Sequence, residues 1–463
     1  MHDLETLHSG AYKASGLAKL KLTGPLESFP EEILELGETL EHLDLSGTGL
    51  STLPEELGTR LPRLKIAFFS DCRFATFPKG LAGCPLLEMV AFRGNGMNAV
   101  PEDSLPPRLR WLILTNNKIE TLPASIGNCS RLQKCMLAGN RLTRLPDEMS
   151  SCRKLGLLRL SANRLTKLPD WLFELPELAF LSFAGNPCAS TRLNSGRARR
   201  NSMSLPQIHW SNLEIHDVLG EGASGIISKG VRRCSRGSGS EEEVAIKLFK
   251  GSLTSDGTPA DELEVCMSAG SHGNLIDALG RIHGHPDASA EEFRGGLVMQ
   301  LIPPFYRTLG KPPTLESCTR DHYDPDAALS PEAAIGVLSG IASAARHLHA
   351  NAISHGDLYA HNILVSGDGH ALLGDMGAAT IYGDQRFPLL EKLEVLAFSH
   401  LIEDVLGLMG RGPYQDHAEV RQQLQDIQRQ CSVPRPSGRP DFAAVIDALR
   451  GPAGLVKATA LPN

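Results

Sequence analysis

The sequence of 463 residues lacks several features that would assign it to a specialised class of protein. It begins Met1-His-Asp-Leu-Glu-Thr, without a basic segment followed by an apolar run, so we expect no secretory signal. No stretch approaches the roughly 20 apolar residues that a membrane helix needs, so we expect no membrane span. The formal net charge of -7 gives no electrostatic reason to expect nucleic acid as a partner.

The ten cysteines include no Cys-x-x-Cys pair. In a chain of this length, such usage is typical of reduced thiols rather than of a disulfide framework or a structural zinc site. We therefore expect a cytoplasmic location. The composition is 41% hydrophobic and 21% charged, which indicates ordinary globular protein, and the length allows two or three domains.

The first two fifths of the chain repeat one pattern every 22 to 24 residues, and six of the units carry a proline fourteen positions after the opening residue. A unit reads L-x-x-L-x-L-x-x-N, as in LRWLILTNN and LGLLRLSAN. Its first, fourth and sixth residues are expected to point into a core beneath a short parallel strand. The asparagine that follows suits the backbone groups at the turn between coils. The asparagines in this position are Asn95, Asn117, Asn140, Asn163 and Asn186.

This register resembles the leucine-rich repeat family. The resemblance implies an α/β solenoid with a curved parallel sheet over residues 1–188, with about eight repeats from residue 15. We take residues 189–206 as a polar linker, because TRLNSGRARRNSMS is basic, rich in serine and asparagine, and without apolar periodicity. A second domain is expected over residues 207–452, followed by a tail over 453–463.

The remaining strand positions of the repeats carry large apolar side chains, which a solvated sheet face does not need. A contact surface is therefore expected on the concave side. One possible occupant is the chain's own linker or second domain. The other is a protein partner anchored on Trp111, because aromatic side chains often carry binding energy. The expected surface consists of Ile66, Phe68, Met89, Trp111, Ile113, Met136, Leu157 and Phe180.

Three glycines in LGEGASGIISKG, at positions 220, 222 and 225, begin the pattern of the second domain. Their spacing alone is a weak signal that also fits a dinucleotide-binding fold. That fold requires a helix directly after the glycines, whereas IISKGV continues as a strand. The glycines are therefore expected in a hairpin whose backbone N–H groups can lie over phosphates. The next strand, EEVAIKLF, carries Lys247, whose ammonium group suits phosphate oxygens.

The stretch ISHGDLYAHNIL has the His-x-Asp-Leu-x-x-x-Asn spacing of enzymes that move a phosphoryl group. Here Asp357 is placed to accept or orient the proton of an acceptor hydroxyl, and Asn362 to reach a metal ion. Further along, ALLGDMGAA holds Asp375 where an Asp-Phe-Gly motif has its magnesium ligand, with Met376 in place of Phe. Each motif alone is a weak signal. Together, four polar groups in this order after a glycine hairpin are a specific signal for phosphoryl transfer; they are Lys247, Asp357, Asn362 and Asp375.

From about Leu213 to Leu449 the chain thus resembles the protein kinase family. The resemblance implies an α+β bilobal fold and transfer of the γ-phosphoryl group of ATP to a protein hydroxyl, of serine or threonine, with Mg2+. The implied catalytic residues are Asp357, Lys247 and Glu262, with Glu264 left open as the partner of Lys247; the implied metal ligands are Asn362 and Asp375. The residues implied to contact ATP are Gly220, Glu221, Gly222, Gly225, Ile227, Ala245, Lys247, Met299, Gln300, Leu301 and Ile302.

Three features depart from the family. Gly356 replaces the arginine that receives an activation-loop phosphate in many kinases, which predicts an enzyme not switched in that way rather than an inactive one. Tyr359 replaces a lysine, so some neutralisation of transition-state charge is missing or comes from elsewhere. Only nineteen positions separate Asp375 from Glu394, with no Ala-Pro-Glu between them, so the segment that cradles a protein substrate is short.

These departures keep two other functions open. HGDLYAHNIL also resembles the aminoglycoside and choline phosphotransferase family, which favours His-Gly-Asp and lacks a protein-docking segment. The glycine hairpin, VAIK and the later GRPDF favour a protein kinase. The other alternative is a nucleotide-binding pseudokinase whose repeats are the working part, against which the retention of all four polar groups argues. If the chain is a protein kinase, the repeats are expected to select a partner or to restrain the catalytic domain.

Overall fold

The computed structural model describes two compact units. One comprises Met1–Leu178 with Asn186–Cys188, and the other Ala179–Gly185 with Ala189–Asn463. Of the expected linker only the two ends, Ala189 and Pro206, are described, and the rest of it lies outside the described residues. The structure describes residues 2–189, 206–222, 224–233, 240–251, 253–254, 256–286, 295–383, 387–411 and 417–459.

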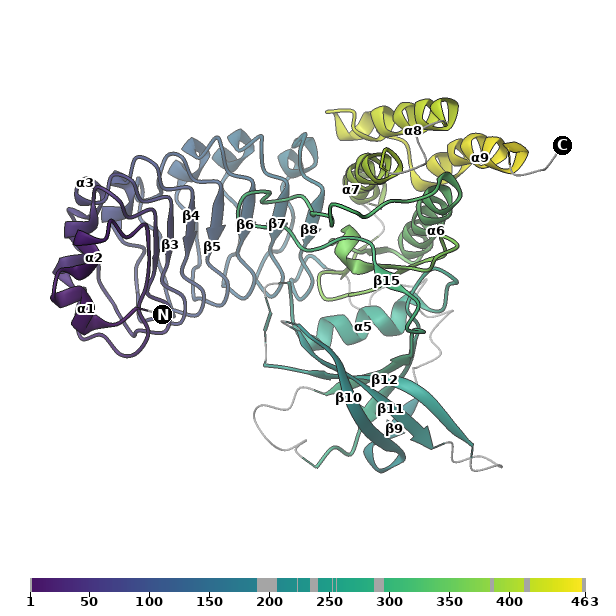
Figure 1. Cartoon of the computed structure of the whole chain (residues 1–463), viewed down its shortest axis with the longest axis horizontal. Coiled ribbons are helices and arrows are strands. Elements are labelled where there is room, and N and C mark those ends of the chain that lie inside the picture. Colours follow the sequence, from purple (N-terminus) through teal and green to yellow (C-terminus); the bar gives the residue numbers. More distant parts are fainter. Residues whose placement is uncertain are drawn as a thin grey trace. The chain divides into compact units, whose positions relative to one another are not determined.

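One sheet takes its eight short strands in chain order, as Figure 1 shows. Neighbouring strands from β1 to β7 run parallel, with Val90 opposite Leu112 and Leu112 opposite Cys135. These central residues and their equivalents in the other strands are buried in the core. The strands are β1 (Lys19–Lys21), β2 (His42–Asp44), β3 (Ile66–Phe68), β4 (Met89–Ala91), β5 (Trp111–Ile113), β6 (Lys134–Met136), β7 (Leu157–Arg159) and β8 (Phe180–Ser182).

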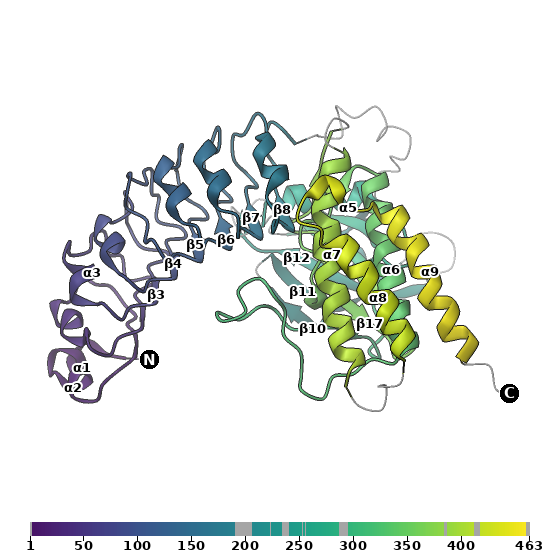
Figure 2. The ribbon, with the colours of Figure 1, turned by 90° about the horizontal axis from the view of Figure 1, so that it is seen from above.

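Short helices return the chain from one strand of the first unit to the next, along the outer side of the arc in Figure 2. Five of them are 3-10 helices that follow a proline, whose fixed φ and missing N–H suit a helix start. The helices between strands are η1 (Glu31–Leu36), α3 (Leu57–Arg60), η2 (Lys79–Gly83), η3 (Ala124–Asn128), η4 (Asp147–Ser151) and η5 (Asp170–Glu174), while α1 (Leu4–His8) and α2 (Ala11–Ala14) precede β1.

Buried asparagines join successive coils. The Asn117 side-chain oxygen accepts the N–H groups of Asn95 and Met97 at 3.1 and 2.9 Å. Its Nδ2 donates to the carbonyls of Phe92 and Leu114 at 2.8 and 2.9 Å. The predicted role of the repeat asparagines at the turns is therefore confirmed. Equivalent bonds are made by Asn95, Asn140, Asn163 and Asn186.

The predicted contact surface of the repeats is unevenly exposed. Met89, Leu157 and Phe180 are almost completely buried, whereas the other five members are half-buried. The Lys134 ammonium group lies 4.4 Å from the ring centroid of Trp111, a favourable cation–π geometry. The central aromatic side chain of the surface is therefore already in contact with a cation of the next strand.

The second unit has two lobes, and the first is built on a six-stranded sheet in the order β10-β11-β12-β14-β13-β9. Its core contains Ile208, Val244, Ile246, Ile282 and Val298. Helix α5 (Pro259–Ala269) begins with Pro259 at its first turn and Thr258 as N-cap, whose side chain accepts the N–H of Asp261. The strands are β9 (Gln207–His209), β10 (Leu213–Glu221), β11 (Gly225–Arg233), β12 (Glu241–Phe249), β13 (Ala278–His283) and β14 (Gly296–Gln300).

The other lobe is mostly helical, and Figure 1 shows its long helices gathered away from α5 and β10–β12. Helix α6 (Pro331–Ala350) buries an alanine- and leucine-rich face and starts at Ser330, which caps the N–H of Ala333. Helices α7 (Phe387–Met409), α8 (Ala418–Cys431) and α9 (Phe442–Thr459) complete the bundle. The short elements are β15 (Arg307–Thr308), β16 (Ile353–Ser354), β17 (Ile363–Val365), β18 (Ala371–Leu373), β19 (Thr380–Ile381), η6 (Trp210–Asn212), η7 (Ala360–Asn362) and η9 (Pro436–Gly438).

The predicted fold class, a repeat solenoid followed by an α+β bilobal domain, is confirmed. Across the residues that the structure covers, no helix is both long enough and apolar enough to span a bilayer.

Candidate active site

Lys247 on β12 and Glu262 on α5 form a buried ion pair, with Nζ 2.5 Å from Oε1. Both side chains are almost fully buried, with relative exposures of 5% and 4%. Burial by itself lowers the pKa of Lys247, but the carboxylates of Glu262 and Asp375 outweigh burial and raise that pKa above its usual value. The ammonium group is therefore charged at neutral pH. Of the two glutamates that the sequence left open, Glu262 is the one that pairs with it.

Asp375 lies close to this ion pair. Its Oδ1 accepts the N–H of Gly377 at 3.1 Å. A Cβ built on Gly377 would lie 3.2 Å from that oxygen and 3.7 Å from Oε2 of Glu262. Gly377 therefore separates two carboxylates, and Asp375 itself is exposed and has a positive φ of 51°. An exposed carboxylate beside a buried ammonium group is a suitable ligand for a metal ion bound to an anion.

Asp357 and Asn362 are held together in the catalytic loop, defined here as residues 353–364. Nδ2 of Asn362 donates to Oδ2 and to the backbone carbonyl of Asp357, both at 2.9 Å. The 3-10 turn η7 places Asn362 at this distance, five residues beyond Asp357. The Asp357 side chain is half-buried. The loop thus presents a half-buried carboxylate whose Oδ2 accepts a hydrogen bond from Asn362.

His355 connects this loop to the strand that precedes Asp375. The imidazole is fully buried. Its Nδ1 accepts the N–H of Asp357 at 3.3 Å, and its Nε2 lies 2.9 Å from the carbonyl of Gly374. Because a carbonyl can only accept, Nε2 carries the proton and donates it. His355 therefore fixes the spacing between the two predicted catalytic segments.

Glu394 on α7 holds the start of the catalytic loop by hydrogen bonds. Its carboxylate, with 2% exposure, accepts from the backbone N–H of Gly356 at 2.5 Å, from Ser354 Oγ at 3.1 Å and from His349 Nε2 at 2.6 Å. Burial alone would raise the pKa of Glu394, but His349 and these hydrogen bonds keep that pKa below its usual value. Glu394 therefore holds Ser354 and Gly356 at the start of the catalytic loop.

The three glycines of the hairpin have different environments. A Cβ on Gly225 would lie 2.4 Å from the carbonyl of Leu248, so the close approach of β12 requires glycine there. A Cβ on Gly220 or Gly222 would meet no atom within 4 Å. The N–H of Gly222 donates to the carbonyl of Gly225 at 2.9 Å. Gly225 is thus explained by packing, while the other two border open space.

The other residues expected around a nucleotide lie on three adjacent strands. Ile227 on β11 is opposite Lys247 on β12, and Ala245 is opposite Met299 on β14. Glu221 ends β10 and forms an ion pair with Lys250, an interaction that sequence reasoning did not identify.

The expected hinge follows β14. The N–H of Gln300 donates to the carbonyl of Asp277 at 2.9 Å, so this donor is already engaged within the lobe. Leu301 and Ile302 come after the end of the strand. Of the three residues predicted to offer backbone hydrogen bonds to an adenine ring, Gln300 therefore already uses its N–H group within the lobe.

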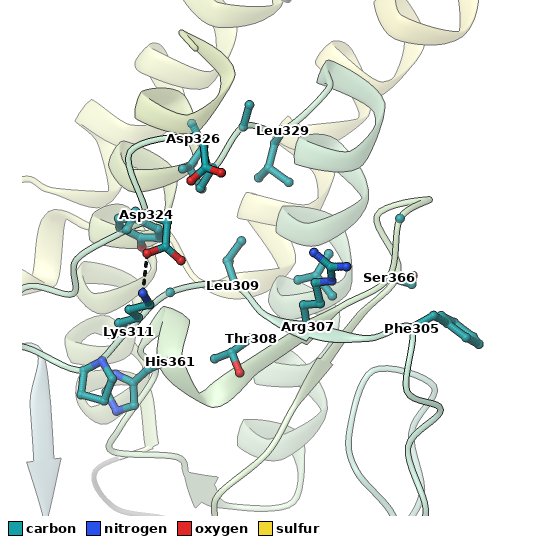
Figure 3. A pocket seen from close by; sticks show the side chains of 18 residues that line it. Phe305, Arg307, Thr308, Leu309, Lys311, Asp324, Asp326, Leu329, His361 and Ser366 are labelled. Carbon is teal, nitrogen blue, oxygen red and sulfur yellow. Dashed lines mark hydrogen bonds and ion pairs between the residues drawn. The ribbon is translucent and has the colours of Figure 1, made fainter. Parts of the chain in front are cut away.

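A separate cavity of about 970 Å³ lies beside the catalytic loop (Figure 3). Leu309 and Leu329 line it together with charged side chains, of which Lys311 and Asp324 form an ion pair. His361 also lines the cavity, and its Nδ1 lies 2.8 Å from Oδ1 of buried Asp321. Sequence reasoning missed this contact, because residues 303–330 carry neither a motif nor a periodic pattern.

The comparisons with known proteins agree with this geometry. The family model described as protein tyrosine and serine/threonine kinase matches residues 213–391. Two leucine-rich repeat models match residues 39–59 and 107–165. A search of curated proteins found no match. The chain consists of leucine-rich repeats followed by a domain of the protein tyrosine and serine/threonine kinase family.

Proposed function

We propose that the protein is an ATP- and Mg2+-dependent protein kinase that phosphorylates serine or threonine hydroxyls. The observation that carries the proposal is two pairs of side chains whose segments are joined, because the N–H of Gly374, next to Asp375, donates to the carbonyl of Asn362 at 2.9 Å. Lys247 is paired with Glu262 beside Asp375, and Asp357 is hydrogen-bonded to Asn362. A charged ammonium group near one exposed carboxylate, and a second carboxylate held in place near an amide, match the needs of phosphoryl transfer.

The residues present fit ATP and magnesium. Among the described residues no three His, Cys, Asp or Glu side chains are grouped as a metal site. Mg2+ commonly takes only one or two protein ligands and completes its shell with phosphates and water, so Asn362 and Asp375 suffice. Gly220 and Gly222 leave space where a side chain would stand, which suits backbone contact with phosphates. Bound ATP would supply the phosphoryl group, and the metal would neutralise its charge.

In this proposal each polar side chain has one task. Lys247 binds phosphate oxygens and is kept charged and oriented by Glu262. Asp357 orients the acceptor hydroxyl and accepts its proton, while the amide of Asn362 fixes one of its oxygens. The residues that would hold the nucleotide base include Ala245 and Met299, which are opposite each other on adjacent strands, and Leu301 and Ile302, which would provide backbone contacts.

Two alternatives make different predictions. A small-molecule phosphotransferase of the aminoglycoside or choline kinase type would use the same polar groups on a small alcohol. A pseudokinase would bind nucleotide without turnover, leaving the repeats as the working part. The second alternative is disfavoured by the retention of all four polar groups, because a protein that only binds nucleotide has no need of a base such as Asp357.

The repeats are proposed to bind a protein partner or to regulate the kinase domain, with Trp111 and Met136 in the contact surface. A cytoplasmic location is proposed from the cysteine usage. The cysteines that the structure describes are free thiols, and burial raises the pKa of Cys84 and Cys152 to about 12, so these two are unreactive core side chains.

The discriminating experiment is incubation of the full chain with Mg2+ and γ-labelled ATP, with generic proteins in one reaction and pooled small alcohols in another. The proposal expects label on serine or threonine of the chain or of an added protein, identified by mass spectrometry. Label found only in small molecules would favour the phosphotransferase alternative. Nucleotide binding without any transfer, in Mg2+ or Mn2+, would favour the pseudokinase.

A further inference from the structure

Residues 179–185, which belong to the second unit, lie against the catalytic loop. We call them the brace segment. The ring of Phe180 stacks on that of Tyr359, with centroids 3.9 Å apart and planes inclined by 9°. Both side chains are almost fully buried, at 2% and 5% exposure. Tyr359 is two residues from Asp357, so the stack fixes the part of the loop that follows the proposed base.

A second contact holds the strand that pairs with the start of the loop. The backbone N–H of Phe183 donates to Oγ1 of Thr380 at 3.1 Å, and both residues are buried. Thr380 on β19 is paired with Ser354 on β16, directly before His355. The brace segment therefore touches the loop itself and the segment that follows Asp375.

Gly356 shows how closely the brace segment approaches. Its φ is +71°, and a Cβ at this position would lie 2.7 Å from the carbonyl of Leu181 and 2.8 Å from that of Ala378. No side chain fits between these two carbonyls. The glycine in His-Gly-Asp is thus explained by packing: the brace segment occupies the space that an arginine side chain at this position would need.

We propose that the brace segment is a positioning element for Asp357, with Phe180 and Phe183 as its positioning residues. It orders the catalytic loop by ring stacking and one hydrogen bond, contacts that require no phosphate. Catalytic competence would then depend on residues 179–185 rather than on phosphorylation of the short segment after Asp375. This inference rests on the proposed kinase function, because a positioned base matters only if phosphoryl transfer occurs.

The test compares Phe180→Ala with Phe77→Ala in the full chain. Phe77 is an equally buried phenylalanine in the first unit and controls for loss of a core ring. Phe180→Ala is expected to lower kcat about ten- to hundredfold through misplacement of Asp357, with the KM for ATP changed less than about threefold. Phe77→Ala is expected to leave kcat of the folded protein unchanged. Phe180→Tyr, which keeps the ring stack, is expected to restore most of the rate.

Hydrogen exchange of residues 353–364 is the second readout. Faster exchange in Phe180→Ala but not in Phe77→Ala supports the inference, whereas unchanged exchange together with an unchanged kcat overturns it. If Phe180→Ala does not fold, Thr380→Val removes only the hydroxyl that accepts from Phe183 and is held to the same criteria. If the wild-type protein transfers no phosphate to any acceptor, the proposed function is wrong. The hydrogen exchange of residues 353–364 would then be the measurement that decides whether residues 179–185 order the catalytic loop.

Discussion

The side-chain amide of Asn362 donates to both the carboxylate and the backbone carbonyl of Asp357, at 2.9 Å in each case. Two bonds from one amide fix the carboxylate relative to its own backbone. The other polar pair of the proposed site, Lys247 with Glu262, comes from the opposite lobe. Phosphoryl transfer in this protein would therefore depend on both lobes, and each pair can be tested separately.

Replacing Glu262 by glutamine is expected to lower kcat/KM for ATP about ten- to hundredfold, because the buried ammonium group of Lys247 loses its carboxylate and its orientation. The measurement is steady-state kinetics with a generic protein substrate. Glu264→Gln, in the same helix and less buried, is the matched control and is expected to stay within about threefold of wild type. Equal losses in the two variants would contradict the assigned pairing.

Asn117→Ala is expected to destabilise the first unit by about 2 to 4 kcal/mol, since it leaves buried backbone groups in adjacent coils without partners. Urea unfolding followed by circular dichroism measures the effect. The control is Asn98→Ala, which replaces an exposed asparagine in the preceding coil. It should change the free energy of unfolding by less than about 0.5 kcal/mol. A loss below 1 kcal/mol for Asn117→Ala would show that the asparagine ladder is dispensable.

Gly356→Ala is expected to cost about 2 to 4 kcal/mol of stability, because the residue has a positive φ and its new Cβ would collide with two carbonyls. Gly407→Ala is the matched control. It lies in α7, a Cβ there meets no atom within 4 Å, and alanine should stabilise the helix by about 0.5 to 1 kcal/mol. Thermal unfolding of both variants makes the comparison, and equal melting temperatures would contradict the close approach of Leu181.

His400 predicts a dependence of stability on pH. Burial, with a further contribution from the nearby guanidinium of Arg320, lowers the pKa of His400 from 6.5 to about 4. His400 of the unfolded chain therefore becomes protonated below about pH 6.5, whereas His400 of the folded protein becomes protonated only near pH 4. The stabilising contribution is complete above pH 6.5 and is lost as the pH falls through this window.

Between pH 7 and pH 5 this single group should lower the free energy of unfolding by about 1 to 2 kcal/mol, allowing for the partial exposure of the ring. His400→Gln removes the titration and should show a correspondingly smaller fall between the two pH values. Urea unfolding at both values gives the comparison. The same fall in both proteins would assign the effect to other groups.

The fold could be predicted from the sequence wherever a period or a motif acts locally. The repeat register located strands such as Trp111–Ile113 and the buried role of Asn117, because each coil buries its leucines in the same way. Lys247 and Asp375 were found by their place in short motifs. Their proximity also follows, since the family fold brings these motifs together.

The remaining features depend on contacts between residues distant in sequence. Gly356 was interpreted as a lost arginine, whereas the structure relates it to the carbonyl of Leu181, and no local pattern encodes that approach. Asp321 lies in an irregular segment, and only the folded chain brings it to His361. Arg439 is a further example, because it donates to the carbonyl of Lys392, 47 residues away in the sequence, as well as to that of Val433.

The central claim is that Asp357 is the base of a phosphoryl-transfer site, and Asp357→Asn tests it most directly. This variant keeps the shape of the side chain, and Asp326→Asn, an exposed carboxylate outside the proposed site, is the control. With labelled ATP and Mg2+, we predict that Asp357→Asn transfers phosphate at least about a hundredfold more slowly than wild type while still binding nucleotide, and that the control matches wild type. Undiminished transfer by Asp357→Asn would contradict the account.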